Sequence, residues 1–206
     1  MGGVELITGA GDEDVAAWIR QRLLRALDRS DAPVAVCLPG GSTPVPILQD
    51  LAKRPLDWGR ITVWPGDDRI VPPAHPASNE GQLRAILEPV GAEVVTLSIM
   101  EEVPHFALTW LGMGDDGHIA SLFPNTDPDP ADDQRVRRIT PDPLPSEAPF
   151  DRVTLTIPAL LDADEVLFVI RGDAKRRLFE QAMRGECDLP VARLLATARQ
   201  KVTCFA

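Results

Sequence analysis

The sequence feature that most restricts the fold is an alternation of short apolar runs with amphipathic segments of helical periodicity. Residues 34–38 (VAVCL) and 61–64 (ITVW) are apolar and β-prone at consecutive positions, which is typical of strands buried on both faces. Residues 12–28 instead repeat their apolar side chains at helical spacing. Strands that alternate with helices favour an α/β fold, in which helices cover both faces of a mostly parallel sheet. The further expected strands are 93–98, 106–111, 152–157, 165–170 and 202–205, and the further expected helices are 44–51, 83–87, 158–163, 175–183 and 191–198.

The size and composition of the chain narrow the class of protein. With 206 residues, of which 44% are hydrophobic and 25% charged, we expect a single domain over residues 1–206. The net charge of −10 argues against a nucleic-acid or anionic-membrane partner, so a phosphate site would need a local group of cations and N–H groups. The chain has no run of 18 apolar residues and no apolar leader, so we expect a cytoplasmic location. Whether the protein is a monomer or a small homo-oligomer stays open.

The cysteines and two of the histidines give no indication of a metal site. Cys37 and Cys204 lie in apolar runs and are expected to be small core residues, and the three cysteines have no zinc-like spacing. His75 and His105 each stand next to a proline, and we expect both on the surface. Neither a metal nor a cofactor is therefore expected.

The most informative stretch for function is residues 111–124 (LGMGDDGHIASLFP), which follows the expected strand 106–111. Its three glycines within six residues indicate that the backbone turns sharply or approaches a ligand closely. Asp116 precedes a short helix that is expected from His118 to Leu122. In an open α/β sheet the ligand site lies beyond the carboxyl ends of the strands, where this stretch would be placed. The alternative is a tight strand-to-helix turn with solvated acids and an incidental histidine.

A second glycine loop, residues 39–44 (PGGSTP), follows the strand 34–38. Thr43 is expected to cap the next helix, with Pro44 at its first position. A glycine loop that leads into a helix offers N–H groups to a phosphate. The loop lacks the Gly-Lys-Ser/Thr ending of a Walker loop and the second glycine of a nucleophile elbow. By itself it predicts a structural turn or an anion cradle with equal weight.

Three further side chains could bind a phosphate. The planar fork of Arg69 can bind phosphate oxygens, although Arg69 could instead pair with Asp67 or Asp68 and hold its own loop. Asn79 could equally cap the following helix. Lys175 stands in the first turn of an expected helix, where the helix dipole disfavours a cation, which slightly favours a functional role. Taken alone, however, a lysine at this position is more typical of an exposed surface residue.

Residues 124–149 differ in composition from the rest of the chain, because they hold seven prolines and several acids. Such a segment predicts a long loop, with a possible strand at 134–140. Its position after the glycine–histidine stretch would let it rim the site.

These blocks resemble, in sequence and in order, the signature of the 6-phosphogluconolactonases. The resemblance rests on residues 40–44, on 67–69 with 78–79, on 112–124 and on 172–175. It implies the sugar-phosphate isomerase and CoA-transferase type of α/β fold, with a small additional strand region. It also implies hydrolysis of 6-phospho-D-glucono-1,5-lactone to 6-phosphogluconate, in the oxidative pentose phosphate pathway. The substrate-binding residues that it implies are Gly40, Gly41, Ser42, Thr43, Arg69, Asn79, Gly114, Gly117, Ser121, Lys175 and, as a possible helper, Arg171.

The chain departs from the family pattern at three places. Asp68 stands where the family triplet has a glutamate, the connection 99–105 is shorter than usual, and the usual acidic tail is absent. The short connection removes none of the matched residues, whereas Asp68, a shorter carboxylate than glutamate, carries less weight than Asp67 and Arg69.

The implied reaction needs neither a metal nor a covalent nucleophile, because a δ-lactone is an ester already disposed to hydrolyse. A base that activates water and donors that stabilise an oxyanion are enough. We expect neutral His118 to deprotonate the water, with Asp116 or Asp67 fixing its tautomer. The N–H groups of residues 112–117 are candidates for the oxyanion donors.

Two other functions remain as alternatives. The related glucosamine-6-phosphate deaminases and isomerases carry an acid five residues beyond the histidine, where this chain has Phe123. A catalytically silent sugar-phosphate-binding protein is the second alternative, and the intact Asp116-Gly117-His118 sequence argues against it.

Overall fold

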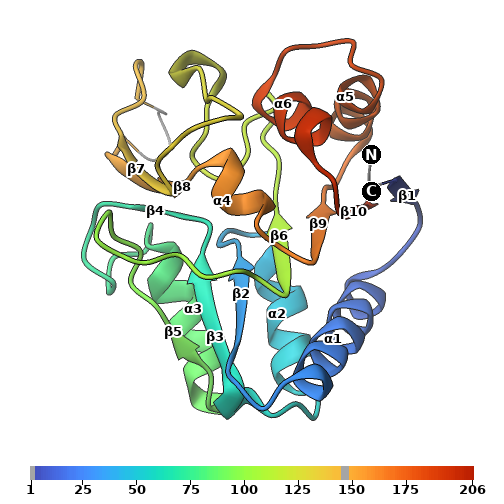
Figure 1. Cartoon of the computed structure of the whole chain (residues 1–206), viewed down its shortest axis with the longest axis vertical. Helices are drawn as coiled ribbons and strands as arrows, with labels where there is room; N and C mark the ends of the chain where they lie inside the picture. The colour runs from blue at the N-terminus through green and yellow to red at the C-terminus, as the bar shows by residue number, and fades with distance from the viewer. Residues whose placement is uncertain (1–2, 145–148) are drawn as a thin grey trace.

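A seven-stranded parallel sheet forms the centre of the computed structural model, which describes residues 3–144 and 149–206 (Figure 1). Its strands are β1 (Val4–Ile7), β2 (Val34–Leu38), β3 (Ile61–Pro65), β5 (Glu93–Val94), β6 (Leu108–Leu111), β9 (Glu165–Val169) and β10 (Lys201–Phe205). They lie in the order β1-β10-β9-β6-β2-β3-β5, and every neighbouring pair is parallel. The expected α/β class is confirmed.

Helices cover both faces of this sheet, which explains why its inner strands are apolar at consecutive positions. The side chain of Val36 enters a core that is shared with α1 (Asp12–Arg29), α2 (Pro44–Ala52) and α3 (Asn79–Leu87). The next residue, Cys37, enters the opposite core, with α4 (Ile157–Leu161), α5 (Asp173–Met183) and α6 (Pro190–Thr197). Both side chains are buried, because neighbouring residues of a strand point to opposite faces. Burial raises the pKa of the Cys204 thiol to about 12, as suits a core residue.

The small additional strand region is an antiparallel sheet of three strands. It consists of β4 (Asp67–Arg69), β8 (Arg152–Leu155) and β7 (Val136–Ile139), in the order β4-β8-β7. Only Gly66 separates β4 from β3, so the small sheet is attached directly at the carboxyl end of a central strand. β7 lies within the expected strand at 134–140, whereas residues 145–148 of the proline-rich segment lie outside the described residues.

The four central strands β2, β3, β6 and β9 all end at the same edge of the sheet, because they are parallel (Figure 1). The segments that follow them are residues 39–43, 66–69, 112–118 and 171–175. These are the four segments to which the sequence assigned functional residues, so the topology gathers them at one end of the molecule.

Two expectations of local structure are wrong, and one edge strand of the large sheet was not expected. Residues 118–122 do not begin a helix, because Ile119 and Leu122 instead exchange backbone hydrogen bonds of 2.9 and 3.4 Å across a tight turn. The expected strand 93–98 is reduced to β5, which has two residues. The edge strand β1 was not expected at all.

No helix in residues 3–144 and 149–206 is both long enough and apolar enough to cross a membrane.

Candidate active site

A cleft of about 350 Å³ lies at the carboxyl ends of the central strands. It receives side chains or backbone from the segments after β2, β3 and β6, from the start of α3 and from the first turn of α5. Its lining residues are Pro39, Gly40, Asp67, Arg69, Asn79, Gly112, Met113, Gly114, Asp115, His118, Ala120 and Lys175.

The ring of His118 is held by Asp116, two residues earlier in the glycine loop. Its Nδ1 lies 2.6 Å from Oδ1 of Asp116, which also accepts the backbone N–H of His118 at 3.1 Å. A carboxylate only accepts hydrogen bonds, so this contact places the proton of the neutral ring on Nδ1 and leaves the lone pair on Nε2. Of the two acids that the sequence left open, Asp116 makes the contact with His118, whereas Asp67 bonds other partners.

The charge of Asp116 suits this contact. Burial raises the pKa of the Asp116 carboxyl, but hydrogen bonds and charge interaction with His118 lower it by more, so its pKa lies below the ordinary value of an aspartate. Asp116 is therefore ionised at neutral pH and can stabilise an imidazolium at His118.

The glycine loop is shaped closely around the His118 ring. The N–H of Gly114 donates to the carbonyl of His118 at 2.9 Å, and the N–H of Gly117 donates to the carbonyl of Gly114 at 3.1 Å. A Cβ on Gly114 would overlap Cε1 and Nδ1 of the His118 ring. On another side the ring packs against Phe123, with 4.8 Å between the ring centroids. Position 114 must therefore lack a side chain if the ring is to keep its place.

The tight turn after His118 connects the glycine loop to the small sheet. Ala120 has a φ of 47°, a left-handed conformation that is uncommon for a residue with a side chain. This turn buries Ser121, whose N–H donates to Oγ1 of Thr154 at 3.3 Å and whose hydroxyl donates to Oδ2 of Asp67. These tertiary bonds are the physical reason why the expected helix does not form.

The guanidinium of Arg69 is anchored by groups other than the neighbouring carboxylates. Its Nη1 donates to the carbonyl of Ala77 at 3.0 Å and to Oδ1 of Asn79 at 2.7 Å. The amide Nδ2 of Asn79 donates in turn to the carbonyl of Asp67 at 2.9 Å and to its Oδ1 at 3.2 Å. Asn79 does not cap α3, because the hydroxyl of Ser78 accepts the N–H of Gly81 and is the cap. Its side chain is thus available to line the cleft.

Lys175 enters the cleft from the first turn of α5. Its Nζ lies 3.7 Å from Oδ1 of Asp115, an acid that is 88% exposed. Together with Arg69, Lys175 gives the cleft two cations within a chain of net charge −10. Such a local cationic group is what a phosphate site in an acidic protein requires.

The structure does not bring all candidate residues to the cleft. Gly40 lines it, and its backbone lies against the Asn79 side chain, while the N–H of Gly41 donates to Oε1 of Gln82 at 2.9 Å. Ser42 and Thr43 are outside the lining, and Thr43 precedes α2 without the expected side-chain capping bond.

Arg171 is also outside the cleft lining. It forms an ion pair of 2.8 Å with Asp12 of α1, 159 residues away in the sequence. Conversely, Ala120 lines the cleft although it was not a candidate, and Met113 and Asp115, which also line it, were candidates only for their backbone N–H groups. Their only signal in the sequence is their place inside the glycine–histidine stretch.

The arrangement can support hydrolysis of an anionic ester. It joins a histidine whose Nε2 carries the lone pair, a carboxylate that fixes the tautomer, and two cations. The N–H groups of Gly114 and Gly117 donate within the loop, so donors for an oxyanion are sought among Gly112, Met113 and Asp115. Within the described ranges 3–144 and 149–206, no group of three His, Cys, Asp or Glu side chains could hold a metal ion.

Known proteins of similar sequence and structure identify the family. The family profile described as glucosamine-6-phosphate isomerases/6-phosphogluconolactonase matches residues 10–93 and 88–204. A 6-phosphogluconolactonase of Pseudomonas aeruginosa is 37% identical over 193 residues, which cover 84% of this chain and 80% of that protein. One of Caulobacter vibrioides is 32% identical over 216 residues, which cover 92% and 90%. A 6-phosphogluconolactonase structure from Thermotoga maritima superposes with a TM-score of 0.84 at 26% identity, over 98% of this chain and 99% of that one. The chain belongs to the glucosamine-6-phosphate isomerase/6-phosphogluconolactonase family.

Proposed function

We propose that this protein is a lactonase that hydrolyses 6-phospho-D-glucono-1,5-lactone to 6-phosphogluconate, a step of the oxidative pentose phosphate pathway. One observation carries the proposal: His118, with its lone pair on Nε2, lines the same cleft as Arg69 and Lys175. A base for water and a pair of cations for a phosphate are the two components that this reaction needs. The relatives of P. aeruginosa and C. vibrioides, which bear this enzyme's name, support the assignment.

In the proposed mechanism, a water molecule attacks C1 of the lactone. Nε2 of His118 takes a proton from the water as its oxygen bonds to C1, and the carbonyl electrons move to the carbonyl oxygen. Backbone N–H groups among Gly112, Met113 and Asp115, which line the cleft, stabilise this oxyanion. The bond from C1 to the ring oxygen then breaks, and His118 returns the proton to that oxygen. Asp116 keeps Nδ1 protonated and stabilises the transient imidazolium.

The substrate phosphate is proposed to lie against Arg69 and Lys175. Gly40, which lines the cleft, would complete its binding, together with Asn79 at the start of α3. Gly41, Ser42 and Thr43 can contribute only if the loop moves toward the cleft, since the N–H of Gly41 donates to Gln82. Arg171 can assist only if it leaves Asp12. We further propose a cytoplasmic enzyme, monomeric or a small homo-oligomer, that uses neither metal nor cofactor.

Two alternatives are less well supported. A glucosamine-6-phosphate deaminase would need an acid at position 123, where a phenyl ring packs against His118. A silent sugar-phosphate-binding protein would have no use for the His118–Asp116 contact. Turnover separates these alternatives from the proposal.

The test is to add the protein to freshly made 6-phosphogluconolactone and follow acid release above the spontaneous rate. We expect saturable acceleration, with a much higher KM for unphosphorylated gluconolactone. Glucosamine 6-phosphate, assayed for ammonia release, serves as the control for the deaminase. If folded protein does not accelerate hydrolysis of the phosphorylated lactone, the proposal is wrong, and calorimetry with 6-phosphogluconate then tests the silent binder.

A further inference from the structure

Strand β4 carries three charged residues in a row, and the strand geometry separates them into two groups. Side chains of a strand alternate between its two sides, so Asp67 and Arg69 face the cleft together. Asp68, between them, points away from the cleft and is only 6% exposed. A buried carboxylate next to two cleft residues needs hydrogen-bond partners, because burying an unpaired charge is costly.

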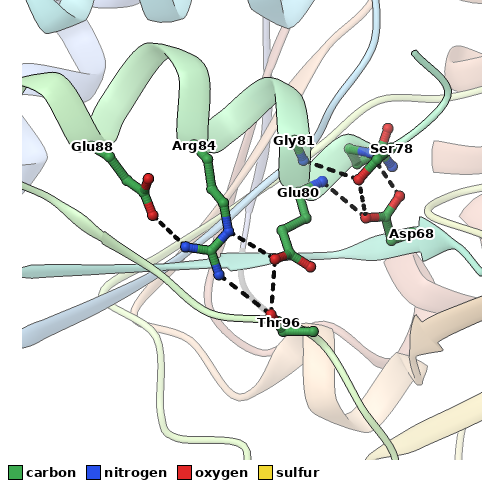
Figure 2. A network of polar contacts seen from close by, with 8 residues as sticks. Asp68, Ser78, Glu80, Gly81, Arg84, Glu88 and Thr96 are labelled. Atoms are coloured by element: carbon green, nitrogen blue, oxygen red, sulfur yellow. Dashed lines mark hydrogen bonds and ion pairs between the residues drawn. The ribbon is translucent and has the colours of Figure 1, made fainter. Parts of the chain in front are cut away.

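The carboxylate of Asp68 accepts four hydrogen bonds, from Arg69 and from residues 78–80 at the start of α3. Oδ1 accepts the N–H of Arg69 at 2.7 Å and the N–H of Asn79 at 2.6 Å. Oδ2 accepts the N–H of Glu80 at 2.9 Å and the hydroxyl of Ser78 at 3.0 Å (Figure 2). Four acceptor sites are the full capacity of a carboxylate, so Asp68 is completely engaged.

One oxygen of Asp68 thus binds the backbones of the two residues that form the Arg69 side of the cleft. The side chains of these residues also meet, since Nη1 of Arg69 donates to Oδ1 of Asn79 at 2.7 Å. We propose that Asp68 is a positioning residue: it fixes β4 against the start of α3 and thereby aims the Arg69 guanidinium at the substrate phosphate. The inference rests on the proposed function, because Arg69 is placed on the phosphate only there.

The proposal requires a carboxylate at position 68 rather than a side chain of the same shape. An asparagine has one acceptor oxygen, and its NH₂ group would face N–H donors. Whichever way the amide of Asp68→Asn faces, its NH₂ group meets at least one of the backbone N–H groups of Arg69, Asn79 and Glu80 and leaves that group without an acceptor. The attachment of β4 to the start of α3 is then weaker, and the position of Arg69 is less well fixed.

The same region offers a matched control in Glu80, which is also buried. Its Oε1 accepts from Nε of Arg84 at 2.7 Å and from the hydroxyl of Thr96 at 2.8 Å (Figure 2). The Glu80 side chain contacts neither Arg69 nor Asn79 in these bonds. Glu80→Gln should therefore destabilise the start of α3 without changing the position of Arg69.

The experiment compares wild type, Asp68→Asn and Glu80→Gln in Tm and in kinetics on phosphorylated and unphosphorylated lactone. Both variants should lower Tm. Only Asp68→Asn should raise KM for the phosphorylated lactone, by about ten-fold, the effect expected when hydrogen bonds that orient a charged group are lost. Its activity on unphosphorylated gluconolactone should stay close to that of Glu80→Gln.

An equal KM for Asp68→Asn and Glu80→Gln at comparable Tm overturns the proposal, because Asp68 is then only structural. If Asp68→Asn does not fold, Ser78→Ala removes one of the four bonds and should raise KM by about two-fold. An unchanged KM in Ser78→Ala also overturns the proposal. Two measurements distinguish failure of the proposed function from failure of this inference. If the wild-type protein does not turn over the lactone, the proposed function is wrong. If calorimetry gives wild type and Asp68→Asn equal affinity for inorganic phosphate, the role of Asp68 is wrong.

Discussion

The protein contains two histidine–aspartate pairs of nearly equal geometry, at opposite ends of the parallel sheet. Nδ1 of His118 lies 2.6 Å from Asp116 beyond the carboxyl end of β6, and Nδ1 of His105 lies 2.7 Å from Asp162 before its amino end. The second nitrogen of His105 is also engaged, at 3.1 Å from Asp164. The ring of His118 makes only one hydrogen bond to the described residues, the one from Nδ1 to Asp116.

The surroundings of the two pairs, and not their geometry, decide what each can do. The acids beside His105 already pair with arginines, since Asp162 binds Arg135 at 2.7 Å and Asp164 binds Arg29 at 3.3 Å. His118 instead shares a cleft with two cations and has Nε2 available for a water molecule. A histidine–aspartate contact is therefore evidence for a base only where one nitrogen faces a ligand site.

The largest expected effect comes from removing the two histidines separately. His118→Ala should lower kcat for the phosphorylated lactone by about 10²–10⁴, the usual contribution of a general base, with little change in KM. His105→Ala is the matched control and should keep wild-type kinetics. Steady-state kinetics of both variants test this, and comparable losses in the two would erase the difference between the pairs.

A smaller but still large effect is expected from Gly114→Ala, which tests whether the loop holds the His118 ring in place. The added Cβ would overlap the ring, so the ring must move away from Asp116. A displacement of about 1 Å at a catalytic group can cost about 10²-fold in rate. We expect kcat to fall by about that factor.

Gly112→Ala is the comparison variant, because a Cβ there would meet no protein atom within 4 Å and would leave the His118 ring in place. Gly112 lines the cleft, so this variant can change KM, but it should retain a far higher kcat than Gly114→Ala. Equal losses in the two variants would indicate that the loop as a whole tolerates no side chain, and that the contact with His118 is not special.

The central part of the fold could be predicted from the sequence because burial on both faces leaves a continuous apolar run. Strands β2, β3, β6 and β9 are of this kind, and all four were expected. Of the strands at the edges, β1 has partly exposed side chains and was not expected, and β5 was expected to be longer than its two residues. Edge strands depend on pairing with a neighbour, which the local sequence does not record.

The site could be predicted only as far as its local motifs. The glycine loop placed His118 and Asp116 together, but a choice between Asp116 and Asp67 needed coordinates. The turn at 119–122 was mistaken for a helix because its cause is non-local: Ser121 bonds Asp67, 54 residues earlier in the chain. The pairing of Arg171 with Asp12 is equally invisible in the sequence.

Asp115 offers a third test, because it is a carboxylate close to Lys175, the cation proposed to bind the substrate phosphate. Oδ1 of Asp115 lies 3.7 Å from Nζ of Lys175 and would compete with that phosphate. Exposed ion pairs contribute up to about 1 kcal/mol, so Asp115→Asn should lower KM for the phosphorylated lactone by at most about five-fold. Kinetics at low salt are the measurement, because salt screens such pairs.

The control for this test is Asp173→Asn, which removes the same charge from the first turn of α5, the helix that carries Lys175. Asp173 is exposed and pairs with Arg176 at 3.3 Å, outside the cleft lining. It should change KM less than Asp115→Asn does. An equal shift in both variants would assign the effect to net charge, and a raised KM in Asp115→Asn would show that Asp115 assists binding.

The smallest expected effect concerns the stability contributed by His105. Hydrogen bonding to Asp162 raises the pKa of His105 above its ordinary value, although partial burial opposes this and Asp164 adds to it. Because its pKa is higher in the folded state, His105 stabilises the fold fully below the unfolded value of about 6.5 and loses this contribution as the pH rises through the folded value. An exposed pair contributes at most about 1 kcal/mol, or about 2–4 °C in a chain of this size.

The Tm of His105→Ala should therefore lie below that of wild type by up to this amount at pH 5.5, and the difference should shrink by pH 9. A difference in Tm that is the same at both pH values would mean that His105 stabilises the fold by packing and not by its charge. The two histidine–aspartate pairs would then differ in the role of the histidine charge as well as in access to a ligand.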